Sequence, residues 1–184
     1  MSARLNPTRA VVSNGLVVTA KQTRKTPAVA INLALRAGAI VDPGDAAGAS
    51  VLLSRVLDRG TTGKSSTEVA DALENRGASL SLSVTRQLLS LTSTCLSEDV
   101  EDIFALLADI VRHPVVPETD LVTRKAQVLT SLQQDADNPA GRSVDAVMAG
   151  LYGDTHPYGR PITGTAASVA PPARHGANDE QVAA

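Results

Sequence analysis

Residues 79–96 read SLSLSVTRQLLSLTSTCL, and this stretch decides the fold. Leucine or valine occupies every second position as far as Val84, and a second alternation starts at Leu89 after the step Arg86-Gln87. A period of two puts apolar side chains on one face of a strand and serine or threonine on the other. The stretch therefore predicts two antiparallel strands with one packed face and one wet face.

The residues before this stretch predict three more strands. Asn14-Gly15 lies between two apolar triplets within residues 8–20 and supplies the positive-φ positions of a tight hairpin turn. Apolar residues then alternate again over residues 29–35, which indicates a strand with one face on the core. The chain is thus expected to begin strand, strand, strand.

Helical periodicity appears on both sides of the strand pair. Residues 46–58 carry an apolar stripe that stops at Gly60, and Ser65 with Glu68 has the spacing of a capping box at the start of a second helix. Three further helices are predicted after the strand pair. The first runs from Ser97, as its N-cap, to His113, with Phe104 facing inward. The second covers residues 117–134, and the third begins at Pro139.

This order of elements fits no parallel nucleotide-binding repeat, and no glycine-rich phosphate loop follows any strand. It predicts an α+β fold in which an antiparallel sheet is covered by helices. The domain is expected to occupy residues 1–165. Residues 166–184 become rich in alanine, proline and polar residues without any period, which predicts a tail without regular structure.

The composition excludes several kinds of partner. The chain has 184 residues, 43% of them hydrophobic, which is enough for one soluble domain with a core. Aromatic residues make up 2%, and 17 basic residues are scattered among 19 acidic ones, so neither nucleic acid nor a membrane surface is an expected partner. The single cysteine, Cys95, excludes an internal disulfide. The absence of a signal-peptide pattern in residues 1–21 predicts a cytoplasmic location.

Several short strings occur in the order found in one family of peptidases. They are Ser13-Asn14-Gly15-Leu16, Arg36-Ala37-Gly38, Gly48, Asp58-Arg59-Gly60-Thr61, Asp137-Asn138-Pro139, His156-Pro157-Tyr158-Gly159 and Gly164-Thr165. Together they resemble the N-terminal domain of the pitrilysin/insulinase family, which includes the mitochondrial processing peptidases. The resemblance extends over most of the chain and implies the α+β fold that the periodicity predicts.

The resemblance also locates a zinc motif that this chain lacks. Active members carry His-x-x-Glu-His on the first helix, where two histidines bind zinc and the glutamate activates a water molecule. The register set by Gly60-Thr61 places these positions on Val51, Ser54 and Arg55, and the third ligand position, on the long helix, falls near Ser131. No zinc, no other cofactor and no peptide hydrolysis by this chain alone are therefore expected.

Other residues offer little replacement chemistry. Without the resemblance, Val51 is simply a core residue of an amphipathic helix, and Ser54 has no histidine within one or two helical turns to activate it. The three histidines, His113, His156 and His175, are far apart and lack carboxylates at ligand spacing. Glu118, Asp120, Asp135 and Asp137 are interpreted as solvated residues at helix ends.

The resemblance implies a partner. Members of the family commonly work as pairs of similar subunits, one with the zinc motif and one without, around a chamber in which a peptide pairs with a sheet edge. The chain is expected to be the non-catalytic subunit of such a heterodimer, which binds peptide or supports the active partner, with residues 29–35 or 89–95 as the pairing edge. The alternatives are a stand-alone protein-interaction module and, least favoured, an active zinc metalloendopeptidase.

The family's first domain normally continues past the position of Gly164-Thr165 into another helix and a strand. The sequence therefore predicts a domain that is incomplete at its C-terminal end, as in a truncated subunit. A missing strand leaves part of the sheet without its neighbour.

Overall fold

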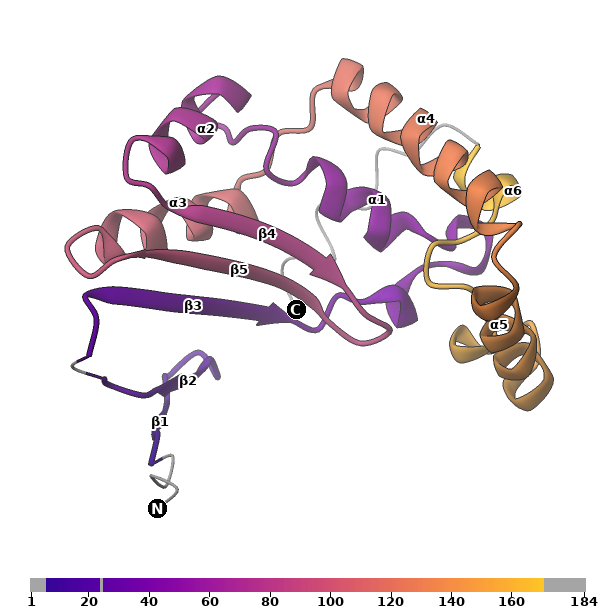
Figure 1. The fold of residues 1–184 in the computed structure, drawn as a ribbon, viewed down its shortest axis with the longest axis horizontal. Coiled ribbons are helices and arrows are strands. Elements are labelled where there is room, and N and C mark those ends of the chain that lie inside the picture. Colours follow the sequence, from indigo (N-terminus) through magenta and orange to yellow (C-terminus); the bar gives the residue numbers. More distant parts are fainter. Residues whose placement is uncertain (1–5, 24, 171–184) are drawn as a thin grey trace.

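The computed structural model describes residues 6–23 and 25–170, whose course is shown in Figure 1. The strands are β1 (Thr8–Val11), β2 (Val17–Ala20), β3 (Ala28–Leu35), β4 (Ser79–Val84) and β5 (Leu89–Leu96). The helices are α1 (Ala49–Val56), α2 (Ser66–Glu74), α3 (Val100–Arg112), α4 (Glu118–Asp135), α5 (Pro139–Tyr152) and α6 (Ala166–Val169), with short 3-10 helices η1 (Ala39–Val41), η2 (Gly44–Ala46) and η3 (Pro157–Gly159). The predicted α+β class is confirmed.

The main sheet has three strands in the order β3-β5-β4, and every neighbouring pair is antiparallel. β5 pairs along its whole length with β3 on one side and with β4 on the other. The expectation that residues 89–95 form a free edge is therefore wrong, because that strand lies in the centre. Of the two predicted pairing edges, residues 29–35 remain, and β4 forms the opposite edge.

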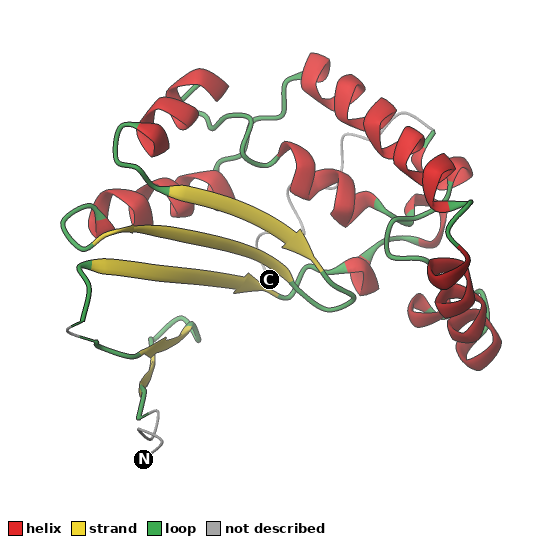
Figure 2. Cartoon of the chain, in the orientation of Figure 1, coloured by secondary structure: helices red, strands yellow, loops and turns green. Residues whose placement is uncertain are grey.

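The two faces of this sheet differ as the alternation predicted. Leu89 and Leu91 on β5 and Ile31 on β3 are buried, whereas Asn32 and Thr92, which lie opposite each other in the register, are exposed. Helices α1, α2 and α3 all lie on the apolar side of the sheet (Figure 2). The main core is therefore a single layer between the sheet and these helices.

Helix α3 supplies the largest share of this core but differs in detail from the prediction. Its buried residues are Ile103, Leu106, Leu107, Ile110 and Val111. The expectation that Phe104 faces inward is wrong, since 54% of its surface is exposed. Phe104 lies about 100° around the helix from Ile103, at the margin of the buried stripe. Ser97 is not the N-cap either; Asp99 occupies that position, and the Ser97 N–H donates to the Pro27 carbonyl at 2.7 Å.

A second, smaller core joins elements distant in sequence. Leu52 of α1, Val128 of α4 and Val169 of α6 are buried together. Helix α6 starts with a capping box in which Thr165 and Ser168 exchange hydrogen bonds. The predicted domain end at residue 165 is thus too early by at least these residues, because α6 belongs to the packed structure. The rest of the predicted tail, residues 171–184, lies outside the described residues.

Most of the local signals are confirmed. β1 and β2 form the hairpin around Asn14-Gly15, with Gly15 at φ +85°. The capping box of Ser65 and Glu68 starts α2, and Asn138 caps α5 ahead of Pro139. None of the helices in the described part of the chain is long and apolar enough to cross a membrane.

Candidate functional site

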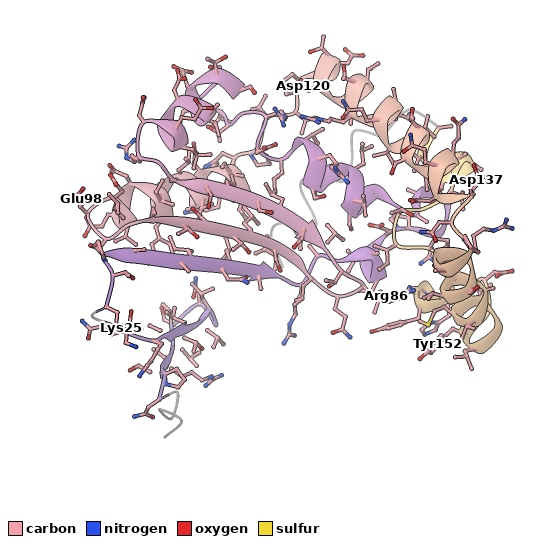
Figure 3. All side chains as sticks on the ribbon, viewed as in Figure 1. Lys25, Arg86, Glu98, Asp120, Asp137 and Tyr152 are labelled. Atoms are coloured by element: carbon pink, nitrogen blue, oxygen red, sulfur yellow. The ribbon has the colours of Figure 1, made fainter. Side chains whose placement is uncertain are left out.

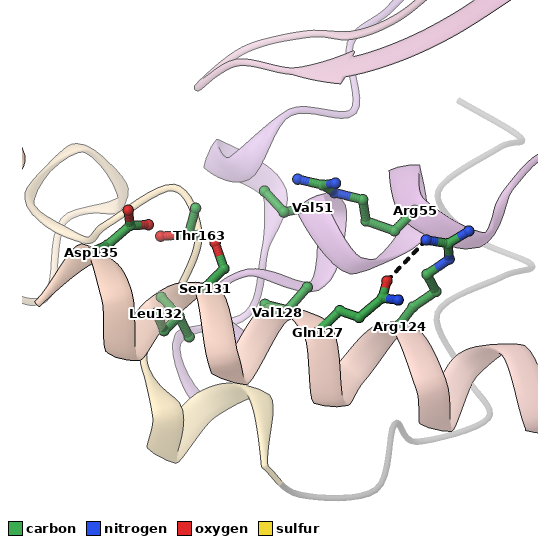
Figure 4. A pocket seen from close by; sticks show the side chains of 9 residues that line it. All are labelled: Val51, Arg55, Arg124, Gln127, Val128, Ser131, Leu132, Asp135 and Thr163. Carbon is green, nitrogen blue, oxygen red and sulfur yellow. Dashed lines mark hydrogen bonds between the residues drawn. The ribbon is translucent and has the colours of Figure 1, made fainter.

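A small cavity lies between the facing helices α1 and α4 (Figure 4). Its volume is about 90 Å³. Val51 and Arg55 line it from α1, Thr163 from the segment before α6, and six residues from α4: Arg124, Gln127, Val128, Ser131, Leu132 and Asp135. The α4 residues recur every three or four positions, so they lie on one face of the helix. Both helices thus present their side chains to one space.

The start of α1 is fixed by a buried carboxylate. Asp42 is only 3% exposed, and it accepts hydrogen bonds from the backbone N–H groups of Gly48 and Ser50 at 3.0 Å each, together with one from the Ser50 hydroxyl. These are N–H groups that have no partner inside the helix. The Arg160 guanidinium donates to the Asp42 carbonyl at 3.2 Å. Asp42 therefore connects the first turn of α1 to the segment that leads to α6.

Replacing Asp42 with alanine is expected to lower the free energy of unfolding by about 2–3 kcal/mol, because the buried donors of Gly48 and Ser50 lose their acceptor. Burial raises the pKa of Asp42, against the effect of its hydrogen bonds from Ser50 and Gly48 and of the Arg160 charge. The Asp42 carboxyl group therefore stays protonated to a higher pH in the folded chain than in the unfolded chain. The stabilisation that Asp42 contributes declines as the pH rises through its raised pKa.

Urea unfolding of Asp42→Ala and of the native chain at about pH 4 and pH 7 checks both statements, and the loss should be larger at the lower pH. Asp45→Ala is the matched control, since Asp45 lies three residues away in the same turn but is exposed. Equal losses for the two variants would show that Asp42 does not hold α1.

Two glycines allow the chain before α6 to touch the start of α1. Gly48 has φ +93°, and a Cβ atom on it would lie 2.5 Å from the Thr163 carbonyl oxygen. Gly164 has φ +73°, and its Cβ would collide with the carbonyl oxygen of Ala47. The Ser168 hydroxyl also donates to the Ala47 carbonyl at 2.7 Å. This contact explains why glycine occurs in two of the strings singled out in the sequence, and it places Thr163 beside the cavity.

The string His156-Pro157-Tyr158-Gly159 is also structural. The His156 ring accepts the Tyr158 N–H at 3.1 Å and stacks on Tyr152 with ring centroids 5.3 Å apart. Tyr158 in turn contacts the turn between β4 and β5, where Arg86 lies over its ring at 5.6 Å and Gln87 donates to its hydroxyl at 2.7 Å. Figure 3 shows Arg86 directed toward the end of α5 that carries Tyr152. The string therefore anchors the end of α5 to the sheet.

The structure brings together three of the four residues at the predicted motif positions. Val51, Arg55 and Ser131 line the same cavity, from α1 and α4 respectively. Ser54 does not line it, because its hydroxyl donates back to the Val51 carbonyl at 2.7 Å. A hydroxyl engaged within its own helix, away from the cavity, is not positioned as a nucleophile.

Sequence reasoning missed the other polar residues of the cavity. Arg124, Gln127 and Asp135 lie at helical spacing from Ser131, so a search along the same face of the predicted helix would have found them. Asp135 had been interpreted only as a solvated helix-end carboxylate. Asp120 and Asp137 lie near opposite ends of α4 and form no acidic pair (Figure 3). Thr163 had no local signal, because it reaches the cavity through tertiary packing.

The side chains of this cavity do not fit a zinc ion. Zinc in proteins is held by three or four histidine, cysteine or carboxylate ligands. Among residues 6–23 and 25–170, no three such side chains are grouped so that they could hold a metal. The cavity contains one carboxylate, Asp135, and two guanidinium groups, Arg55 and Arg124, whose charge opposes that of a dication. His113 pairs with Asp109 at 3.2 Å, outside this cavity.

The fold and the cavity together define an α+β domain in which α1 and the long helix α4 face each other, and the cavity between them is lined by Val51, Arg55 and Ser131. The chain belongs to the insulinase family, peptidase family M16, whose model matches residues 17–166. The resemblance noted in the sequence is therefore confirmed.

Several relatives are similar over most of this chain. An uncharacterised zinc protease of Mycobacterium tuberculosis is 26% identical over 168 residues, which are 91% of this chain and 38% of that protein. The mitochondrial-processing peptidase subunit alpha of Solanum tuberosum is 27% identical over 158 residues, 86% of this chain and 31% of that protein. The crystal structure of a peptidase M16 inactive domain from Pseudomonas fluorescens matches with a TM-score of 0.84 and 28% identity, over 91% of this chain and 41% of that one. The chain thus spans between 31% and 41% of the length of these relatives.

Proposed function

We propose that this chain is a non-catalytic peptidase M16 domain that binds peptide or supports an active homologous subunit, and that it does not hydrolyse peptides alone. The observation that carries the proposal is the cavity between α1 and α4. The register of the resemblance assigns Arg55 to a position at which active members have a zinc-binding histidine, and Arg124 brings a second positive charge to the lining of the same cavity. Such a site cannot activate water through a bound metal ion.

The comparisons support the same role. One similar solved structure is that of an inactive domain, and one similar relative is a subunit of a processing peptidase, a name that implies at least one other subunit.

Exposed apolar side chains support contact with another subunit. Val144, Val147 and Leu151 on α5 are each at least 59% exposed. They recur at helical spacing and form one apolar stripe. An apolar stripe of this kind is common where a helix packs against a partner. Among the described strands, β3 and β4 are the two edges of the main sheet, and the edge of β3 is the one at which we propose that a bound peptide pairs.

The proposal is tested by zinc analysis and peptide hydrolysis, on the purified chain alone and after mixing with the most similar homologue from the same source that retains His-x-x-Glu-His. The expected result is less than stoichiometric zinc and no hydrolysis for the chain alone, and a changed rate or substrate preference for the homologue in the mixture. Stoichiometric zinc with chelator-sensitive cleavage by the chain alone would refute the proposal.

A matched pair of variants locates the contact. Val147→Asp should abolish the effect on the homologue, because it places a charge in the apolar stripe of α5. Val122→Asp is the control, since Val122 is 62% exposed but lies on α4. If the homologue is unaffected by the native chain, the supporting role is lost and only a binding module remains.

A further inference from the structure

The two arginines of the cavity lack an acidic partner. Among the described residues 6–23 and 25–170, no carboxylate forms an ion pair with Arg55 or Arg124. The Arg124 guanidinium donates to the side-chain oxygen of Gln127 at 2.9 Å, which orients it without neutralising its charge. Both side chains line the cavity; Figure 4 shows the Arg124 side chain extending from α4 toward α1 and the Arg55 side chain lying along α1. The cavity therefore has positive charge to offer to a ligand.

The chemistry of these groups selects a class of ligand. A guanidinium is planar, always charged and donates several hydrogen bonds in a fork that matches a carboxylate. Two guanidinium groups from different helices can hold one carboxylate from two directions.

The other residues that line the cavity indicate which chemical group could lie next to the bound carboxylate. Val51, Val128 and Leu132 form an apolar wall, and Ser131 with Thr163 adds hydroxyl groups. A volume of about 90 Å³ is several times the 10–15 Å³ that one water molecule requires, but it is far below the 300–1,000 Å³ of most small-molecule sites. The cavity thus has room for a carboxylate and one short apolar side chain, and the rest of the ligand must lie outside.

We propose that this cavity binds the C-terminal carboxylate of a peptide whose last side chain is short and apolar, such as alanine or valine. The inference rests on the proposed peptide-binding function and adds the class of peptide end that is recognised. Arg55 and Arg124 bind the carboxylate, and the apolar wall receives the last side chain.

The test measures binding of fluorescein-labelled hexapeptides ending in alanine to the whole chain by fluorescence polarisation, at low and at physiological salt. Three peptides distinguish the sources of the carboxylate: one with a free C-terminus, the same peptide amidated, and an amidated one with an internal aspartate. The free C-terminus is expected to bind at least about tenfold more tightly than either amidated peptide, as for loss of a charged hydrogen-bonded group. Inorganic phosphate is expected to compete weakly.

Three variants complete the test. Arg55→Gln and Arg124→Gln should each weaken binding of the free peptide about tenfold, whereas Arg112→Gln, an equal charge change at an exposed residue of α3, should leave it unchanged.

Equal binding of the free and amidated peptides would overturn this inference while leaving peptide binding intact. Equal effects of the Arg55, Arg124 and Arg112 variants would also overturn it. Absence of binding by every peptide would overturn the inference as well, and the supporting role would then be judged by the mixing experiment alone.

Discussion

Replacing Gly48 with alanine is expected to lower the free energy of unfolding by about 2–5 kcal/mol. The positive φ of Gly48 costs an L-residue about 1–2 kcal/mol, and forcing a methyl group into a filled space costs about 1–3 kcal/mol more. The new Cβ would lie 2.5 Å from the Thr163 oxygen and 2.9 Å from its carbonyl carbon, both of which are backbone atoms that cannot rotate away. Urea unfolding followed by circular dichroism measures the loss.

Gly63→Ala is the matched control for this variant. Gly63 also lies in a turn, but no neighbouring atom lies within 4 Å of the position that its Cβ would occupy, and its φ is outside the positive range. Its replacement should change the stability by less than about 1 kcal/mol. If Gly48→Ala behaved like Gly63→Ala, the contact between the start of α1 and Thr163 would be wrong.

Replacing Ile110 with alanine is expected to lower the free energy of unfolding by about 3–4 kcal/mol, while Phe104→Ala changes it by less than about 1 kcal/mol. Ile110 is fully buried in the core beneath β5, and its truncation leaves a cavity that the sheet and α3 cannot close. Phe104 is on the same helix but is largely exposed. Urea unfolding curves of the two variants measure these changes. A larger loss of stability for Phe104→Ala than for Ile110→Ala would support the inward orientation of Phe104 that the sequence predicted.

The parts of the fold that sequence reasoning predicted well are those with local causes. The alternation of Leu80 and Leu82 with serine, the capping box at Ser65 and the proline after Asn138 each act within a few residues. Their consequences, strands and helix ends, do not depend on the rest of the chain. The central place of β5 is different, because pairing with β3 is a long-range choice that periodicity does not encode.

The side of a helix that is buried is also a tertiary property. Phe104 and Ile103 are adjacent and both apolar, and only the position of the sheet decides which of them is covered. Similarly, the end of the domain was placed too early because Val169 forms its contacts with Leu52 and Val128, which are distant in sequence. An alanine-rich segment has no internal signal for such contacts.

The cavity was predictable in part. The resemblance supplied a register that placed Val51, Arg55 and Ser131 at equivalent positions, and the structure brings these three around one space. The register of the motif could not show that Ser54, unlike these three residues, does not line the cavity. Ser54 lies about 100° around the helix from Arg55. Its hydroxyl bonds to its own helix instead.

The central position of β5 has a consequence for the chain entropy of the sheet. In the register, Leu89 of β5 lies opposite both Val84 of β4, 5 residues earlier, and Leu35 of β3, 54 residues earlier. Because closure entropy grows with the logarithm of loop length, joining β3 to β5 costs about 2 kcal/mol more than closing the β4–β5 hairpin. The long-range entropy cost of the sheet is therefore concentrated at the seam between β3 and β5, next to the edge that β3 forms.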